Sequence, residues 1–258
     1  MKRRKLVRYA GASFLATLGL GLVSHQQTFQ AQTSGSLSVQ WLGHTCFLFS
    51  GGGRRVLVNP FRPIGCTAGY RPPQVSADLI MISSRLFDEG ALEGLPGNPR
   101  LLAQPGEYDL NNMRVQGINT DHDREGGRRF GANVVWRWNQ AGINIVHLGG
   151  IAGPIELEQQ ILIGRPDVLL APVGGGPKAY NPEEAAAAVR TLNPKLVIPT
   201  HYRTQAADPE ACDIVELDQF LALMQGVQIS RLGGDTLTVS PSNLPANGMK
   251  IQVLSYRF

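Results

Sequence analysis

The sequence predicts one α/β domain in which two β-sheets pack together and are covered by helices. From residue 36 to about residue 150, short apolar strand-like runs alternate with turns rich in Gly, Pro and Asn. The second half interleaves segments of helical spacing with further apolar runs. Of the 258 residues, 43% are hydrophobic and 17% are charged, as is typical of a folded globular protein rather than a disordered one.

The strands of the first half follow from their apolar runs and from the turn residues between them. Residues 36–60 predict two strands, LSVQWLGHTCFLFS and RRVLVNP, joined by a turn at the three glycines 51–53. After loop signals at residues 60–73, a buried strand is predicted at 79–82. Two or three short strands are predicted in PRLLAQPGEYDLNNMRVQGINTDHD, and a hairpin that turns at residues 140–142 in NVVWRWNQAGINIVHLGG.

Helices enter in the second half, at PIELEQQILIG, NPEEAAAAVRTLNP and VELDQFLALMQG. The middle one has the strongest start signal, because Asn181 is a favoured N-cap and Pro182 a favoured first helical residue. Strands are predicted at DVLLAPVG, KLVIPTHY, VQISRLGGDTLTVS and KIQVLSYRF. No repeat or linker interrupts residues 36–258, so we predict a single domain there.

Residues 1–31 are typical of a targeting segment. Five cations and no acid precede an apolar stretch from about residue 10 to 23, which is short for a membrane span. The Arg3-Arg4 pair predicts a twin-arginine signal, with an ordinary secretory signal and an uncleaved anchor as alternatives. Cleavage near Ala31 would leave no permanent membrane span. We therefore predict export to the periplasm, or to the thylakoid lumen in a photosynthetic organism.

The net charge outside the targeting segment gives no support to a nucleic-acid partner. The whole chain has a formal charge of +4, but residues 32–258 hold 19 Lys and Arg against 20 Asp and Glu. Three cysteines occur: Cys46 in a strand-like run, where we expect a buried hydrophobic role, and Cys66 and Cys212 in loops. Export permits a disulfide between the last two, and the sequence leaves this open.

Seven segments carry a resemblance to a known family: WLGHTCFL, VLVNPF, ADLIMISSRLFDEGAL, NTDHDREGGRRFGANVVW, VHLGG, DVLLAPVGGG and LVIPTHYRT. In this order and spacing they resemble the metallo-beta-lactamase superfamily over about residues 38–230. The similarity is greatest to its branch of Zn-dependent hydrolases of the beta-lactamase fold, which includes ascorbate-phosphate lactonase-like proteins. The resemblance implies an αββα sandwich of two mixed sheets flanked by helices. It implies much less about activity, because function depends on the site.

The family binds two zinc ions, and the resemblance implies that most of their ligands are replaced here. The family motif Thr-His-x-His-x-Asp-His falls on residues 83–89, where it retains Asp88. Family ligands are replaced at four positions: Ser84 and Leu86 stand for histidines, Gly150 for the bridging aspartate, and Asn59 for the aspartate of Asp-Pro. Glu89 stands for the last histidine of the motif, while His122 and His201 match ligand histidines.

These residues predict that a dinuclear site is absent. Of the first zinc site only His122 remains, and one imidazole does not hold zinc. The second retains Asp88 and His201, with Glu89 as a carboxylate substitute. Each of these residues also has an interpretation without a metal. Asp88 and Glu89 can be solvent-facing loop acids. His122 can be a hydrogen-bonded loop residue, and His201 can be a cleft histidine inherited with the fold.

Four further features bear on the cleft. His44 is expected to form a hydrogen bond to backbone or to a cleft carboxylate. Arg85 is expected either to lie on the surface or, in the cleft, to bind an anion or to supply the charge of the missing metal. His147 is expected to be a packing residue. The turn VGGGPKAYNPEEA is not a Walker loop, and we interpret it as scaffold beside the cleft first and as a substrate contact second. No Gly-x-Ser-x-Gly elbow supports a serine hydrolase.

The leading hypothesis is an exported protein of this fold with a degenerate metal site: a pseudoenzyme that needs no cofactor and binds an unknown small molecule or protein. The alternative is a hydrolase with one divalent ion, Zn, Mn or Fe, at Asp88, Glu89 and His201. A third reading is a structural protein whose cleft binds nothing.

Overall fold

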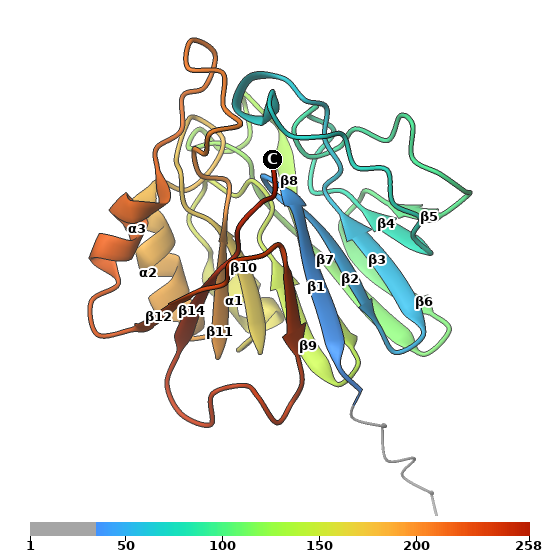
Figure 1. Cartoon of the computed structure of the whole chain (residues 1–258). Helices are drawn as coiled ribbons and strands as arrows, with labels where there is room; N and C mark the ends of the chain where they lie inside the picture. Colours follow the sequence, from blue (N-terminus) through green and yellow to red (C-terminus); the bar gives the residue numbers. More distant parts are fainter. Residues whose placement is uncertain (1–34) are drawn as a thin grey trace, which may run out of the picture. The chain divides into compact units, whose positions relative to one another are not determined.

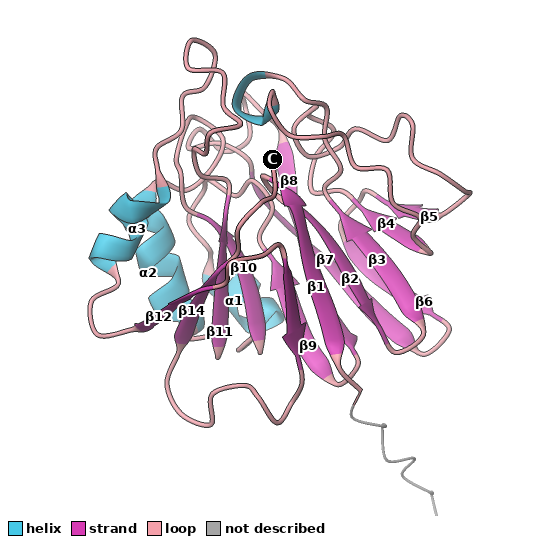
Figure 2. Ribbon diagram, in the orientation of Figure 1, coloured by secondary structure: helices cyan, strands magenta, loops and turns pink. Residues whose placement is uncertain are grey.

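The computed structural model describes residues 35–258, and the predicted signal segment, residues 1–31, lies outside them. Within the described residues, the strands form two mixed β-sheets that are accompanied by three α-helices (Figures 1 and 2). This confirms the predicted α/β sandwich. None of the described helices has the length and apolar character that a membrane crossing needs.

The first sheet has six strands in the order β13-β1-β2-β3-β4-β5 within the described residues. Neighbours from β13 to β3 are antiparallel, and β3, β4 and β5 are parallel. The strands are β1 (Leu37–Gly43), β2 (Cys46–Gly51), β3 (Arg54–Val58), β4 (Leu79–Met81), β5 (Arg100–Leu102) and β13 (Thr236–Val239).

The second sheet, described over the same residues, has the order β12-β14-β11-β10-β9-β8-β7-β6. It is antiparallel from β6 to β9 and parallel from β9 to β12. Its strands are β6 (Gly106–Leu110), β7 (Met113–Asp121), β8 (Ala132–Gln140), β9 (Ile143–His147), β10 (Val168–Pro172), β11 (Leu196–Thr200), β12 (Gln228–Arg231) and β14 (Lys250–Val253).

The helices α1 (Leu157–Ile163), α2 (Pro182–Leu192) and α3 (Leu217–Leu223) belong to the second half, as predicted. The predicted cap of α2 is present: Asn181 Oδ1 accepts a hydrogen bond from Glu184 N at 2.8 Å, and Glu184 Oε2 accepts one from Asn181 N at 2.9 Å. Helix α2 packs on β10 and on α3, and α1 packs on β7. A short 3₁₀-helix, η1 (Gly65–Thr67), lies in the loop after β3.

The core lies between the sheets, where large buried side chains of β2 and β8 meet. The rings of Phe49 and Trp138 are perpendicular, with centroids 4.9 Å apart. Gln140 Nε2 donates to the carbonyl oxygens of Gly51 and Arg54, both at 3.1 Å, and so satisfies backbone acceptors of the opposite sheet. These contacts fix the register of the two sheets and with it the positions of the loops at their strand ends.

Two predicted strands are wrong in extent. The segment VQISRLGGDTLTVS forms two strands, β12 and β13, which belong to different sheets. Residues 36–50 form two antiparallel strands, β1 and β2, with the pair Gly43↔Cys46 next to the turn. The chain reverses because Gly43 has φ +115° and His44 has φ +51°, conformations that an extended strand does not contain. The reversal places His44 in a tight turn at the end of β1, instead of inside a strand.

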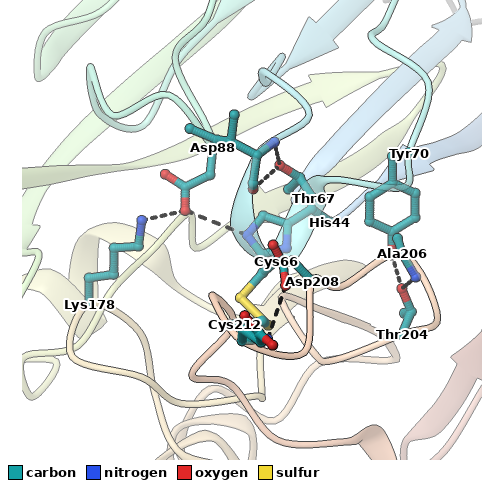
Figure 3. Close-up of a disulfide and its surroundings, with 12 residues drawn as sticks. His44, Cys66, Thr67, Tyr70, Asp88, Lys178, Thr204, Ala206, Asp208 and Cys212 are labelled. Atoms are coloured by element: carbon teal, nitrogen blue, oxygen red, sulfur yellow. Dashed lines mark hydrogen bonds and ion pairs between the residues drawn. A yellow bond between two sulfur atoms is a disulfide. The ribbon is translucent and has the colours of Figure 1, made fainter.

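A disulfide joins Cys66 in η1 to Cys212 in the loop after β11, 146 residues later (Figure 3). Cys46, by contrast, is free and buried, as expected for a small core residue. The disulfide therefore links a loop of the first sheet to a loop of the second.

His147, the last residue of β9, bridges the two sheets in the neutral form. Its Nε2 lies 3.0 Å from Thr45 O, and its Nδ1 accepts a hydrogen bond from Gly149 N at 3.0 Å. Both ring nitrogens are therefore satisfied only when Nδ1 carries no proton. Burial lowers the pKa of His147 from 6.5 to about 4.

We predict that the Cys66→Ser/Cys212→Ser variant loses about 3–5 kcal/mol of unfolding free energy, because a long closed loop no longer restricts the unfolded chain. Urea unfolding of both proteins, with and without a reducing agent, checks this. The reducing agent should destabilise the wild type and leave the variant unchanged. Equal stability of the two oxidised proteins would contradict the prediction.

We predict that acid destabilises the protein through His147 between about pH 6.5 and pH 4. In this range the unfolded chain binds a proton at His147 and the folded chain does not, so the stabilisation is complete above pH 6.5 and declines below it. The loss is about 3 kcal/mol, since one pKa unit corresponds to about 1.4 kcal/mol. Urea unfolding across this range should show a flatter pH dependence for His147→Asn than for the wild type. Parallel curves would contradict the prediction.

Candidate functional site

The predicted site residues come from loops at one edge of the two sheets. His44 follows β1, Asn59 follows β3, residues 83–89 follow β4, His122 follows β7 and His201 follows β11. These loops lie at the top of Figure 1. Three of these residues, His44, Asn59 and His201, have positive φ angles of 51°, 52° and 51°. Such backbone is uncommon outside glycine, and its clustering at one edge supports a functional site there.

Three of these side chains converge: His44, Asp88 and His201 each offer a ligand atom, and these atoms all lie within 4.8 Å of one another. The two imidazole rings have centroids 4.4 Å apart, and His44 Nε2 lies 3.7 Å from Asp88 Oδ2. Both histidines are buried, and the Asp88 side chain is 16% exposed. His44 was predicted only to bond to backbone or to a cleft carboxylate, and it belongs to this cluster.

Lys178 completes the cluster, and the sequence analysis missed its role. Its Nζ donates to Asp88 Oδ2, the same oxygen that faces His44 (Figure 3). Arg85, which was expected to supply positive charge or bind an anion, is exposed and makes no ion pair within residues 35–258. The available signal was a lysine in the glycine-rich turn after β10, which the resemblance placed beside the cleft.

The surroundings set the charges of this cluster. Burial by itself raises the pKa of the Asp88 carboxyl, but the contact with His44 and the charge of Lys178 outweigh it and hold the pKa well below its usual value. Burial, followed by the proximity of His44, lowers the pKa of His201 well below its usual value. The cluster therefore contains a carboxylate, an ammonium group and, at His201, a neutral imidazole.

Glu89 does not join Asp88 and His201. Its side chain is 4% exposed, and its Oε1 lies 2.7 Å from Nε2 of the fully buried His122. Its Oε2 accepts a hydrogen bond from Asn59 Nδ2 at 3.3 Å. Because Asp88 and Glu89 are consecutive in a turn, their side chains point to different partners. Neither is the fully solvated loop acid of the simplest interpretation.

Gly150 and Asn59 fit around this second pair. A Cβ atom at residue 150 would lie well inside contact distance of His122 Nε2 and 2.6 Å from Glu89 Oε1. Asn59 Oδ1 accepts from Ser83 N at 2.8 Å while its amide donates to Glu89. An aspartate at residue 59 could not donate that bond and would repel Glu89. The two positions that lack the family's aspartates are thus filled by the Glu89–His122 pair and its amide donor.

The two remaining replaced positions offer nothing to a metal. Ser84 Oγ accepts from Leu86 N at 3.2 Å and so stabilises the turn. Leu86 lines the cleft with an apolar side chain. The donor set therefore does not fit two metal ions, because the first site keeps His122 alone and Glu89 already holds it.

A single metal is chemically compatible with the other cluster. Two imidazoles and one carboxylate are a known ligand set for Zn, Mn or Fe. His201 Nδ1 and both ring nitrogens of His44 are buried without a hydrogen-bond partner within the described chain. His44, Asp88 and His201 would hold the ion, and Lys178 opposes it by holding the carboxylate.

The cluster lies at the base of a cavity of about 640 Å³. Its walls come from the loops around η1, Phe130, the glycine-rich turn and residues 210–214, and they include the disulfide. Apolar side chains line the walls, namely Ile64, Leu86, Phe87, Phe130 and Ile214. Charged side chains also line it, namely Arg129, Glu210 and Asp213 besides the cluster at the base. The site thus combines apolar surface with a few charged groups, which is typical of a small-molecule pocket.

We predict that Gly150→Ala destabilises the protein by about 1–3 kcal/mol, because the added methyl group overlaps His122 and Glu89 in a packed interior. Gly233→Ala is the matched control, since a Cβ there meets no atom within 4 Å. Thermal and urea unfolding of the three proteins checks this. If both variants were as stable as the wild type, the Glu89–His122 pair would not occupy the space described.

Comparison with known proteins agrees with this fold. Residues 38–201 match the family model of the beta-lactamase superfamily domain. UPF0173 metal-dependent hydrolases are 29% identical over 203 residues in Thermococcus onnurineus and 30% identical over 206 residues in Thermococcus kodakarensis. Each alignment covers 67% of this chain and 89% of the relative.

A solved structure shows the same similarity. It is the crystal structure of a Thermotoga maritima protein assigned to the Zn-dependent hydrolases of the metallo-beta-lactamase superfamily. It is 29% identical, with a TM-score of 0.67, over 84% of this chain and 98% of that chain. Family model, relatives and structure agree, and the chain therefore belongs to the metallo-beta-lactamase superfamily.

Proposed function

We propose that this protein is a non-catalytic member of its superfamily, a pseudoenzyme that binds a small organic molecule in its cleft. One observation carries the proposal: at both places where the family would hold metal, side chains of this protein contact one another, Glu89 with His122 and Asp88 with Lys178. Each carboxylate therefore already has a side-chain partner within the protein.

The donor chemistry supports the absence of the family reaction. A catalytic metal lowers the pKa of bound water from 15.7 towards 7 and polarises the scissile bond. An ammonium group on Asp88 offers no open coordination position for water. Ser83 Oγ is buried without a partner among the described residues, and no base contacts it. The chain's own residues thus provide charge and shape without an evident nucleophile.

The cleft supports the binding role. Its volume of about 640 Å³ is in the range of small-molecule pockets. The apolar side chains of Phe87, Phe130 and Ile214 would contact the body of a ligand. Lys178 and Asp88 at the base would pair with a polar or charged group. The ligand class that fits is therefore a small organic molecule with an apolar body and one polar end.

A second candidate is a hydrolase with one altered metal site, as the names of the relatives suggest. Its specific support is the convergence of His44, Asp88 and His201, with imidazole nitrogens that lack hydrogen-bond partners in the described chain. In this candidate His44 is the third metal ligand, whereas the sequence-based alternative named Glu89. The ion would bind Asp88 beside the ammonium group of Lys178.

Export is part of the proposal. It is supported by the cationic and then apolar composition of residues 1–31, and by the disulfide between Cys66 and Cys212. Disulfides form and persist mainly in oxidising compartments outside the cytosol.

We predict that residues 32–258, purified without chelators, contain well below one metal ion per chain, because Lys178 and His122 already occupy the two carboxylates. Elemental analysis beside an Asp88→Ala/His201→Ala variant checks this. Adding zinc, manganese or iron(II) should leave the Tm of both proteins unchanged. About one ion per chain that is lost in the variant would overturn the proposal in favour of the single-metal hydrolase.

A further inference from the structure

We infer that Lys178 is a built-in competitor of divalent metal ions, and that this one residue keeps the cluster of His44, Asp88 and His201 from binding a metal. The inference rests on the proposed function, because it explains how a cluster with a metal-like donor set remains metal-free. It also makes Lys178 the residue whose replacement would restore a metal site.

The first support is the position of the ammonium group. Lys178 Nζ bonds to Asp88 Oδ2, and this oxygen is also the one 3.7 Å from His44 Nε2 (Figure 3). Asp88 is the only anionic donor among the three convergent residues. A metal ion that bound Asp88 at the cluster would lie beside the positive charge of Lys178. Without Asp88, two imidazoles remain, which is too few for a stable site.

The second support is that the histidines are ready to coordinate. His201 is 4% exposed and His44 is 2% exposed. His201 Nδ1 and the ring nitrogens of His44 have no hydrogen-bond partner among residues 35–258. Buried polar atoms without partners are unusual and call for an explanation, of which a missing ion is one. The geometry of a ligand set is thus present, while its carboxylate is occupied.

The third support is that the loop carrying Lys178 is held in place. Arg124 Nη1 donates to Gly176 O at 3.0 Å, and Arg124 Nη2 donates to Ala179 O at 2.9 Å, on either side of Lys178. Arg124 is itself fixed by Glu184, with Nε and Nη2 donating to the carboxylate at 2.8 and 2.6 Å. This bidentate pair anchors the loop to helix α2. The backbone on both sides of Lys178 is therefore held beside the cleft independently of the attraction between its ammonium group and Asp88.

The experiment is a cobalt(II) titration of the folded protein, residues 32–258, followed by visible absorption and by Tm. We compare the wild type with Lys178→Met, which removes the charge and keeps the length, and with Lys178→Arg, which keeps the charge. Lys178→Met/Asp88→Asn tests whether any new site uses the carboxylate. Lys195→Met is the matched control, because Lys195 pairs with Asp167 at 2.8 Å at the start of β11, at the other end of the strand from His201.

We expect Lys178→Met to bind cobalt(II) at least about 100-fold more tightly than the wild type. The substitution removes the ammonium group, which competes for Asp88 and also repels the metal ion. The bound ion should also raise its Tm. Lys178→Arg and Lys195→Met should bind as weakly as the wild type, and the double variant should lose the new site. Lys178→Ala replaces Lys178→Met if the methionine disturbs folding, as judged by circular dichroism.

The outcomes separate this inference from the proposed function. If the wild type and Lys178→Met both bind weakly, the inference is overturned and the metal-free proposal stands. If the wild type binds as tightly as Lys178→Met, through Asp88, both are overturned and the single-metal hydrolase replaces them. Tight binding that survives Asp88→Asn would overturn the inference, because the new site would lie elsewhere.

Discussion

Two consecutive carboxylates, Asp88 and Glu89, must be accommodated in a largely dehydrated edge of the sandwich, and the rest of the site depends on the partner that each one finds. Removing a carboxylate from water costs several kcal/mol unless a partner compensates. In the zinc-binding members that this chain resembles, metal ions supply positive charge here. In this protein, Lys178 neutralises Asp88, and His122 with Asn59 accommodates Glu89.

The replaced positions around Glu89 then form a consistent set. Glu89 takes the space next to His122 that a side chain at residue 150 would need, so residue 150 is glycine. Residue 59 is an amide because Glu89 needs a donor there. An aspartate at either position would bring a third carboxylate to a place without a cation to balance it. We interpret these substitutions as mutually dependent, and not as independent losses of metal ligands.

The pair at Asp88 differs in kind from the pair at Glu89. Glu89 and His122 are almost fully buried and turn inward, so they close one of the two places where the family would hold metal. Asp88 and Lys178 remain 16% and 23% exposed at the base of the cavity. This second pair can be reached by a ligand or a metal ion. The open half of the site therefore carries both the proposed binding function and the proposed competition by Lys178.

The sequence by itself determined most of the strand segments, the helices and the superfamily, because these depend on local patterns: alternating apolar residues, turn glycines and the Asn181-Pro182 cap. It also predicted which family ligands are replaced. It did not predict the turn at His44, because the positive φ there interrupts an apolar run that otherwise indicates one strand. Only the tertiary structure decided the partners of the charged side chains. Asp88 and Lys178 are 90 residues apart in sequence, and their pairing depends on how β4 and β10 of two different sheets place their loops.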